Sequence, residues 1–541
     1  MKIKYFKGSH LVNILNINII SIYNVYAMKD TINIIWFKKD LRITDNQCLF
    51  EYETSLPTIA VYFFESDIIR QSDFSDFHLQ FIVSSLIHLE SSLKKIWIQL
   101  LYIPLNAVDG LEYIWKYYSI KKIFAHEETW NLKSFERDKD VIHYTNKNNI
   151  KFIEYPTNWV VRRLKSRDSW NKIWKSRMSH QIYEAKKTTC DFELISEFSS
   201  NSKNCRKYYK HLFETIAQQR NLQKGWEELW KSILKNFLST RSSSYMYNIS
   251  KPFESQSTCS RLSPYITYWC LSVKYVFKET QKRMFELGQL RSTAAQNHIK
   301  SLEYFLSRLH WQSHFIQKLE DEPEMEIKNL NPDFNSIRND TDTWLIDAVF
   351  SARSWIPYID ATVRELQITW WTNFRSRATL VSFLCNTCMQ PWQSVASKIA
   401  QLFTDYEPGI HYPQIQMQAA TTGINTIRIY NPVYNWKQKD IFWKFIYQYL
   451  PELRTVPIDF IHEPHLWDLF ETLEYPHPII DIKQANKEAK DILWKIKWNT
   501  SKETKNKIIK KHASRTFHSD RKNNTSSKKK HTSENNQTTL F

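Results

Sequence analysis

The stretch Ile34-Ile35-Trp36-Phe37-Lys38-Lys39-Asp40-Leu41-Arg42-Ile43-Thr44-Asp45-Asn46 decides the fold of this chain. Residues 32–37 are mostly apolar, β-branched or aromatic, which predicts a short strand, and a charged turn over 38–46 follows it. A second strand of the same character is predicted over 58–64. The chain therefore begins its fold with strands of a sheet.

The predicted elements that follow alternate in type. Helices are predicted over 77–95 and near 111–118, and strands over 96–103, 122–125 and 151–155. Strands that alternate with helices imply a parallel sheet. The fold class predicted for the N-terminal part is therefore a Rossmann-like α/β domain with a parallel sheet.

The second half of the chain has a different pattern. Residues 186–205 have the clearest linker composition, and no strand alternation is found between them and about residue 480. Apolar residues recur there at helical spacing, as in Leu302, Phe305, Leu306, Leu309, Ile316 and Leu319. An all-helical C-terminal domain is therefore predicted.

These patterns give a division of the whole chain. The predicted parts are an extension over 1–29, an α/β domain over 30–165, a linker over 166–220, a helical domain over 221–483 and a basic, largely disordered tail over 484–541. We expect translation to begin at Met28, because the apolar segment 11–26 is interrupted by asparagines and is too short to span a bilayer. No membrane partner is expected.

The composition narrows the function. Lysine and arginine number 74 against 56 acidic residues, a net charge of +18, which favours a nucleic-acid partner. Residues 501–541 contribute 11 basic and 3 acidic residues to that excess. Aromatic residues make up 15% of the chain and offer surfaces for stacking on bases or on a planar cofactor. With only 6 glycines, a glycine-rich phosphate loop is excluded.

Cysteine usage indicates the compartment. Seven cysteines without a tight repeating spacing fit a reducing environment, so a cytoplasmic location is predicted. Cys385 and Cys388 form one CxxC pair, which we interpret as two core thiols rather than half of a metal site. No metal site and no hydrolytic chemistry are predicted, since no triad or paired acids have a recognisable spacing.

Further blocks along the chain, in order, extend the pattern of residues 34–46. They are the turn Cys259-Ser260-Arg261-Leu262-Ser263-Pro264-Tyr265, the helical segment 307–315, the pair 360–364 and 371–377, the loop 402–411, and the closing segment 416–432. Together these blocks resemble the DNA photolyase and cryptochrome family, in particular the bacterial cryptochrome/deoxyribodipyrimidine photolyase type. The resemblance covers roughly residues 31–511.

The resemblance implies a bound FAD and names its contacts. The implied cofactor-binding residues are Tyr245, Cys259, Ser260, Arg261, Leu262, Ser263, Arg308, Trp311, Gln312, Asn373, Arg377, Asp405, Glu407 and His411. Asp405 would pair with Arg377 beneath the flavin, and His411 would face its N5 edge, where a histidine is able to change charge near neutral pH. Ser263-Pro264 also fits a plain helix N-cap followed by proline. A second, antenna chromophore of folate or deazaflavin type is implied for the α/β domain.

The resemblance also assigns roles in catalysis and in substrate binding. Trp392 matches a tryptophan that passes electrons to the flavin, and Trp311 matches one that stacks against the lesion. Trp311, Arg375 and Met417 are the implied substrate contacts. A tryptophan in a helix is more often plain core, so the assignment of Trp311 rests on the family match.

Several positions depart from the family pattern. Arg308 stands where many relatives that repair pyrimidine dimers have a lesion-contacting glutamate, Met417 replaces a tryptophan of the lesion pocket, and Ala378 replaces a histidine of the (6-4) repair class. Ile415 stands where the electron-transfer tryptophan nearest the ring is expected, so photoreduction is predicted to use another route. Its candidate residues are Trp344, Trp355, Trp370 and Trp371, most of which are interpreted as core. Tryptophan and cysteine at 370 and 270 replace glycines, which predicts local backbone strain.

Two functions follow from these observations. The first is light-driven repair of pyrimidine dimers in damaged DNA by electron transfer from reduced FAD, which makes the chain a deoxyribodipyrimidine photolyase-type lyase, expected as a monomer. The alternative is a cryptochrome-like blue-light photoreceptor without repair activity, which the altered lesion pocket favours. A flavoprotein that binds nucleic acid without repair is a third possibility.

Overall fold

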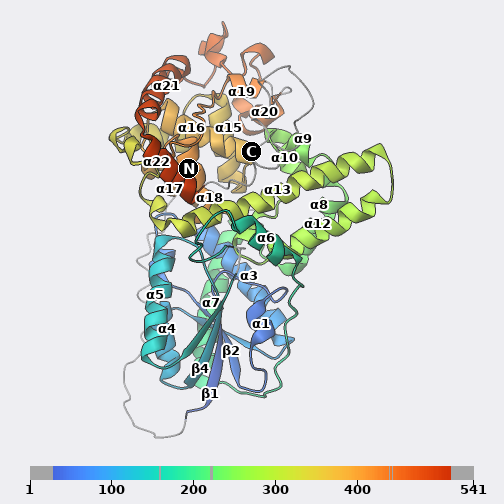
Figure 1. Cartoon of the computed structure of the whole chain (residues 1–541). Coiled ribbons are helices and arrows are strands. Elements are labelled where there is room, and N and C mark those ends of the chain that lie inside the picture. Colours follow the sequence, from blue (N-terminus) through green and yellow to red (C-terminus); the bar gives the residue numbers. More distant parts are fainter. Residues whose placement is uncertain (1–28, 157–159, 220–222, 438, 441–442, 513–541) are drawn as a thin grey trace, which may run out of the picture.

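Five parallel strands form the sheet of the N-terminal domain in the computed structural model, which describes residues 29–156, 160–219, 223–437, 439–440 and 443–512 (Figure 1). The sheet has the order β3-β2-β1-β4-β5, with bounds β1 Thr31–Phe37, β2 Thr58–Phe63, β3 Gln99–Ile103, β4 Ser119–His126 and β5 Lys151–Tyr155. The direction of the strand order reverses between β1 and β4, as in doubly wound sheets. The predicted parallel α/β fold is confirmed.

Helices cover both faces of this sheet, because alternate residues of β1 point to opposite sides. Ile35 and Phe37 pack with α1 (Gln47–Glu51) and α3 (Asp76–Lys94), whereas Ile34 and Trp36 pack with α4 (Ala107–Trp115) and α5 (Leu132–Lys147). A short α2 (Ser66–Ile69) precedes α3. The sequence predicted α3 and α4 but missed α5.

The C-terminal part is helical. Its helices are α8 Glu227–Ser239, α9 Tyr245–Asn248, α10 Pro252–Thr258, α11 Ser263–Thr267, α12 Val273–Gly288, α13 Thr293–Asp321, α14 Thr343–Phe350, α15 Pro357–Thr369, α16 Phe374–Ser382, α17 Trp392–Gln401, α18 Pro408–Gln418, α19 Tyr434–Lys437 and α20 Lys444–Tyr449. The long helix α13 crosses the molecule between the α/β domain and helices such as α15, α16 and α20, whereas α12 lies on its other side (Figure 1). A Cβ added to Gly409 would lie 2.7 Å from the Ile316 Cα, so glycine permits the close approach of α18 to α13.

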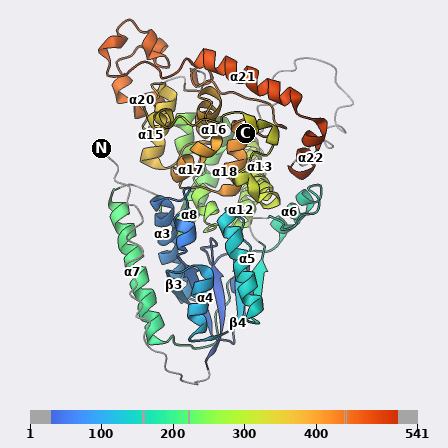
Figure 2. The same ribbon diagram turned by 90° about the vertical axis from the view of Figure 1, so that its left-hand side faces the viewer.

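The segment 166–220, predicted to be a linker, contains two helices instead: α6 Trp170–Ser179 and α7 Ser196–Gln219. Figure 2 shows α7 running along the β3 side of the sheet. Phe198, Cys205 and Tyr209 are buried on one side of α7, and the Tyr209 ring stacks on Phe64 at a centroid distance of 3.7 Å. This apolar stripe makes the segment part of the core even though its composition is polar.

The predicted tail is also partly folded. Helices α21 Ile482–Asn499 and α22 Lys502–His512 lie against the helical domain (Figure 2). Ala489, Leu493 and Ile508 are buried, and His512 pairs with Glu322 at 2.6 Å. The prediction of disorder is therefore wrong for 484–512, because these few apolar side chains are spaced for helical packing. The predictions for residues 1–28 and 513–541 lie outside the described residues, and the domain boundaries stay predictions.

The strain expected where glycines are replaced is found at one position and displaced at the other. Trp370 has φ 57° and ends α15 in the left-handed region, as predicted. Near Cys270 the left-handed residue is Trp269, with φ 44°. Within the described ranges, none of the helices is both long and apolar enough to cross a bilayer.

Candidate functional site

The turn after β1 joins the two domains. Arg42 Nη1 donates to the Trp269 carbonyl at 2.8 Å, and Asp45 Oδ1 pairs with Lys274 Nζ at 2.7 Å. Asn46 accepts from the Leu49 N–H and so caps α1. The charged residues of the fold-deciding stretch therefore hold the helical domain against the carboxyl edge of the sheet.

Four charged side chains converge inside the helical domain. Arg377 Nη2 on α16 lies 2.9 Å from Asp405 Oδ1, which confirms that these two residues form an ion pair. Arg261, from the loop before α11, stacks on Trp371 with its guanidinium carbon 4.0 Å from the ring centroid. Burial raises the pKa of Glu365 on α15 to about 7, and the nearby Arg261 and Arg377 partly oppose that rise.

The predicted phosphate turn is partly buried and well bonded, with Cys259 and Leu262 buried and Ser260, Arg261 and Ser263 half-buried. The Cys259 carbonyl accepts a hydrogen bond from Arg241, and Ser260 Oγ accepts from the Leu262 N–H at 3.4 Å. Ser263 is the first residue of α11, and no side chain caps that helix, so the N-cap interpretation of Ser263 is wrong. Tyr245 is buried against Phe305 at 5.7 Å between ring centroids.

One face of α13 carries polar and aromatic groups. The Arg308 guanidinium carbon lies 4.3 Å from the Tyr304 ring centroid, and the Trp311 and Phe315 rings lie 5.8 Å apart. Arg308 Nε and Gln312 Oε1 are buried without a hydrogen-bond partner among the described residues. On the other side Leu302, Phe305 and Leu309 are buried, as predicted.

Further predicted residues are engaged in the structure. Asn373 Oδ1 accepts from the Ser376 N–H and so caps α16, Arg375 Nη1 donates to Tyr430 Oη at 2.8 Å, and Trp392 Nε1 donates to Asn329 Oδ1 at 2.6 Å. Met417, on α18, is half-buried. Trp392 is fully buried and lies away from solvent.

Glu407 and His411, two of the predicted flavin contacts, are each bonded to a residue outside the loop 402–411. Glu407 Oε2 pairs with Lys39 Nζ of the α/β domain at 3.0 Å, while Glu407 Oε1 is buried without a partner among the described residues. Burial lowers the pKa of His411 to about 3. The expected charge change near neutral pH is therefore wrong, and His411 stays neutral with Nε2 donating to the Ala396 carbonyl at 3.0 Å.

This arrangement fits a bound FAD. Buried polar atoms of Arg308, Gln312 and Glu407 lack partners within the described part of the chain, and such atoms are rare unless a ligand or water satisfies them. The Arg377–Asp405 pair lies in the same domain and offers both signs of charge to a polar ring.

Sequence reasoning missed several residues beside these. Asp73 hydrogen-bonds Tyr406, Lys39 lies 3.1 Å from the Trp130 ring centroid, and His78 Nε2 lies 2.8 Å from the Phe403 carbonyl oxygen. Tyr406 lies inside the recognised loop 402–411, but nothing in its local sequence indicates a partner in the other domain.

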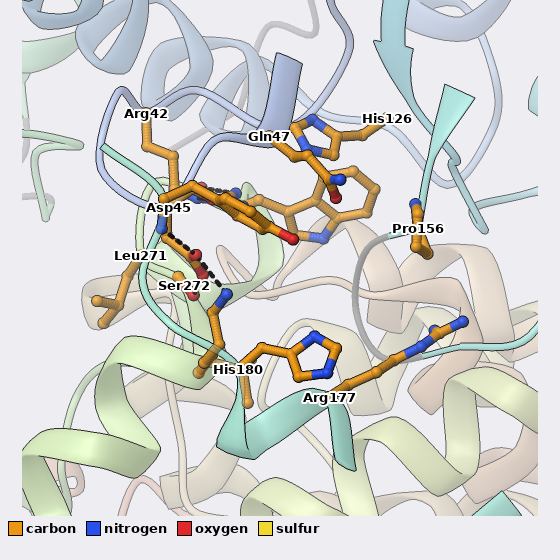
Figure 3. A pocket seen from close by; sticks show the side chains of 13 residues that line it. Arg42, Asp45, Gln47, His126, Pro156, Arg177, His180, Leu271 and Ser272 are labelled. Atoms are coloured by element: carbon orange, nitrogen blue, oxygen red, sulfur yellow. Dashed lines mark hydrogen bonds and ion pairs between the residues drawn. The ribbon is translucent and has the colours of Figure 1, made fainter. Parts of the chain in front are cut away.

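A cavity of about 260 Å³ lies at the carboxyl edge of the sheet (Figure 3). Gln47 and His126 project towards it from the α/β domain, Arg177 from α6, and His180 from the position just after α6 (Figure 3). The other lining residues are Arg42, Asp45, Pro156, Tyr183, Trp269, Leu271, Ser272, Val273 and Lys274.

Behind His126 lies a buried polar group. Ligand atoms of Asp40, Cys48 and His126 lie within 4.8 Å of one another, a set the sequence did not predict. His126 Nδ1 hydrogen-bonds Asp40 Oδ2 at 2.7 Å, and burial raises the pKa of Cys48 well above its usual value. A protonated thiol and an occupied imidazole nitrogen make this set a structural hydrogen-bond group.

Comparison with known proteins identifies both halves of the chain. Residues 33–171 match the family model described as DNA photolyase, and residues 305–495 match the model described as FAD binding domain of DNA photolyase. The deoxyribodipyrimidine photo-lyase of Buchnera aphidicola from Acyrthosiphon pisum is 22% identical over 487 residues, which is 84% of this chain and 95% of that protein. Cryptochrome-2 of Arabidopsis thaliana is 24% identical over 486 residues, covering 84% of this chain and 78% of that one.

Solved structures share the fold. An archaeal photolyase from Sulfolobus tokodaii, crystallised with two FAD molecules, superposes with a TM-score of 0.69 at 20% identity and covers 86% of this chain and 99% of its own. A cryptochrome from Synechocystis gives a TM-score of 0.73 at 18% identity, covering 86% and 100%.

Proposed function

Because the chain belongs to the DNA photolyase and cryptochrome family, we propose that it is a FAD-dependent lyase that uses blue light to repair pyrimidine dimers in DNA. The observation that carries this proposal is the partly buried Arg377–Asp405 pair, together with the buried, unpartnered polar atoms of Arg308 and Gln312 on α13. Both lie in or beside the part of the chain that matches the FAD-binding domain.

The chain's own residues would bind and position the cofactor. Arg377 and Asp405 would hold the ring, the turn 259–263 would hold the phosphates, and His411 would present its unprotonated Nδ1 as an acceptor. Bound FAD supplies the light absorption and the one-electron chemistry, which amino-acid side chains do not provide. Trp311 and Arg375 would meet the flipped lesion, and Trp392 would relay electrons.

The cavity of Figure 3 is the proposed place of the second chromophore. Open α/β sheets bind ligands outside the carboxyl ends of their strands, at the point where strand order reverses. Arg42 follows β1 and His126 ends β4, the two strands on either side of that point, and both line the cavity. We also propose a cytoplasmic monomer; all seven cysteines are free, as expected in a reducing compartment.

A repair assay tests the main proposal. Protein with reduced FAD is given oligonucleotides that contain either a cyclobutane dimer or a (6-4) product, under blue light or in darkness. Light-dependent restoration of one lesion is expected and identifies the lesion class. Arg377→Met is the comparison variant, which should bind FAD more weakly and repair correspondingly less when FAD is limiting.

The alternative function, a cryptochrome-like photoreceptor, is favoured by one feature. Arg308 places a cation on the α13 face beside Trp311, which reverses the charge that dimer-repairing relatives have there. Protein that binds FAD and responds to light, but repairs neither lesion and does not prefer damaged over intact DNA, would support this function and refute repair.

A further inference from the structure

Two tyrosine hydroxyl groups meet one buried carboxylate where the two domains touch. Tyr406 Oη donates to Asp73 Oδ2, Tyr412 Oη lies 3.4 Å from the same oxygen, and the two hydroxyl oxygens are 3.4 Å apart. Asp73 belongs to the loop before α3, whereas Tyr406 precedes α18 and Tyr412 lies within it. All three side chains are at least nine-tenths buried.

These phenols are part of a continuous group of aromatic rings. The Tyr406 ring centroid lies 5.4 Å from Trp130 and 5.1 Å from His411, and the Tyr412 centroid lies 6.3 Å from Trp392. In sequence, Tyr406 lies between Asp405 and Glu407, two of the predicted flavin contacts. An oxidisable side chain therefore sits in the loop proposed to surround the ring.

The family resemblance implies an electron-transfer tryptophan next to the flavin ring, but this chain has no aromatic side chain at that position. Ile415 occupies it and is buried in the same apolar cluster as Trp392 and the two tyrosines. The aliphatic side chain of Ile415 cannot give an electron to a light-excited flavin. Tyr406 and Tyr412 are oxidisable members of that cluster, so they offer an alternative route.

A buried tyrosine loses an electron readily only when its proton has an acceptor within hydrogen-bond reach. Asp73 meets that requirement for Tyr406. Tyr102 is a matched contrast, because its hydroxyl also lies against a carboxylate, Glu90, at 3.2 Å, but inside the α/β domain. Tyr406 differs from Tyr102 in combining a carboxylate acceptor with a place in the flavin loop.

We propose that Tyr406 is a redox-active residue that reduces light-excited, oxidised FAD and passes its phenolic proton to Asp73. Tyr406 gives up one electron to the cofactor and its Oη proton to the carboxylate, which leaves a neutral phenoxyl radical and a neutral carboxylic acid. A thiolate reductant then gives one electron to the phenoxyl radical and becomes a thiyl radical, while Asp73 returns the proton to Tyr406. Tyr412 acts as a positioning residue, because its hydroxyl lies within reach of the same carboxylate.

This inference rests on the proposed function only through bound FAD, and it holds for a repair enzyme or a photoreceptor. The test uses full-length protein with oxidised FAD, flash-illuminated without added reductant and then frozen for electron paramagnetic resonance. We expect a radical whose spectrum narrows when the protein contains ring-deuterated tyrosine but not ring-deuterated tryptophan.

Variants assign the radical to its residue. Tyr406→Phe should abolish the tyrosyl signal while the bound-FAD absorption spectrum is retained. Asp73→Asn keeps an acceptor oxygen but removes the base, and should slow radical formation at least about tenfold. Tyr102→Phe should leave the signal unchanged. In the parent protein, radical formation should be slower in deuterated water.

A tryptophan radical that is unchanged in Tyr406→Phe would overturn the proposal, as would formation of the tyrosyl radical at the parent rate in Asp73→Asn. Failure of the proposed function has a different signature. Protein that shows no flavin absorption before the flash would refute FAD binding, and the redox role would fall with it. Repair by Tyr406→Phe should be normal when FAD is reduced chemically beforehand, so loss of repair there would also contradict a role confined to photoreduction.

Discussion

Removing Lys39 tests the buried ion pair that joins the domains. Lys39 Nζ lies 3.0 Å from Glu407 Oε2, with side-chain exposures of 8% and 1%. Burial lowers the pKa of Lys39 and raises the pKa of Glu407, although each partner opposes the shift of the other. The desolvation cost of the two charges therefore exceeds their attraction, and a neutral pair should serve equally well.

The loss of folding stability in Lys39→Met has an upper limit that can be calculated. Without its partner, Glu407 becomes protonated in the folded state, while it ionises with its ordinary pKa of 4.5 when the chain unfolds. At about 1.4 kcal/mol per pH unit, this costs about 3 kcal/mol at pH 7 and less than about 1 kcal/mol at pH 5. Loss of the cation over Trp130 adds about 1 kcal/mol at both pH values.

Urea unfolding of the full chain at pH 5 and pH 7 separates the pH-dependent cost of protonating Glu407 from the pH-independent loss of the cation over Trp130. The double variant Lys39→Met with Glu407→Gln should recover most of the loss at pH 7. Lys133→Met, which breaks an exposed pair with Glu136 at 3.3 Å, is the control and should change stability by less than about 1 kcal/mol. A Lys39→Met loss that is equal at the two pH values would refute this account of the pair.

Three other substitutions test separate parts of the structure. Burial raises the pKa of Glu326 from 4.5 to about 7, so its contribution to stability is full below pH 4.5 and is lost as the pH rises through 7. Glu326→Gln should therefore stabilise the protein by about 3 kcal/mol at pH 8 and not at pH 4.5, measured by urea unfolding; equal effects would contradict the burial argument. Arg377→Met breaks the pair with Asp405 and should weaken FAD binding about 10- to 100-fold in a fluorescence titration, and unchanged binding would remove this pair from the site. Gly409→Ala should destabilise by at least about 1–3 kcal/mol, because its Cβ would meet the backbone of α13 at 2.7 Å, whereas Gly288→Ala, with open space around it, should not.

The sequence predicted the elements whose apolar pattern is unbroken. Strands of a parallel sheet are buried on both faces and form continuous apolar runs, so β1 and β2 were found almost to the residue. Helix α5 was missed because its buried face includes Arg137 and Asp138, which pair with each other, Arg137 also with Glu65 and Asp138 also with Lys38. Because these buried residues are charged, the hydrophobicity pattern of the sequence does not show the buried face of α5.

The limits of prediction at the site have the same origin. The motifs identified Glu407 and His411, but the state of each depends on neighbours far away in the sequence. Glu407 pairs with a lysine 368 positions earlier, and burial lowers the pKa of His411 so that it stays neutral. Residue type and local spacing determine which groups are present, whereas burial and distant partners determine their charge.

The carboxyl edge of the sheet has an unusual use in this chain. In many doubly wound folds a glycine-rich turn at this edge binds phosphates, and here charged side chains replace it. Lys39 and Asp73 extend from this edge to Glu407 and Tyr406 in the loop before α18. Since both contacts are buried, the position of that loop depends on the α/β domain as much as on the helices around it. The α/β domain is therefore a structural part of the proposed flavin site, in addition to any chromophore that it holds.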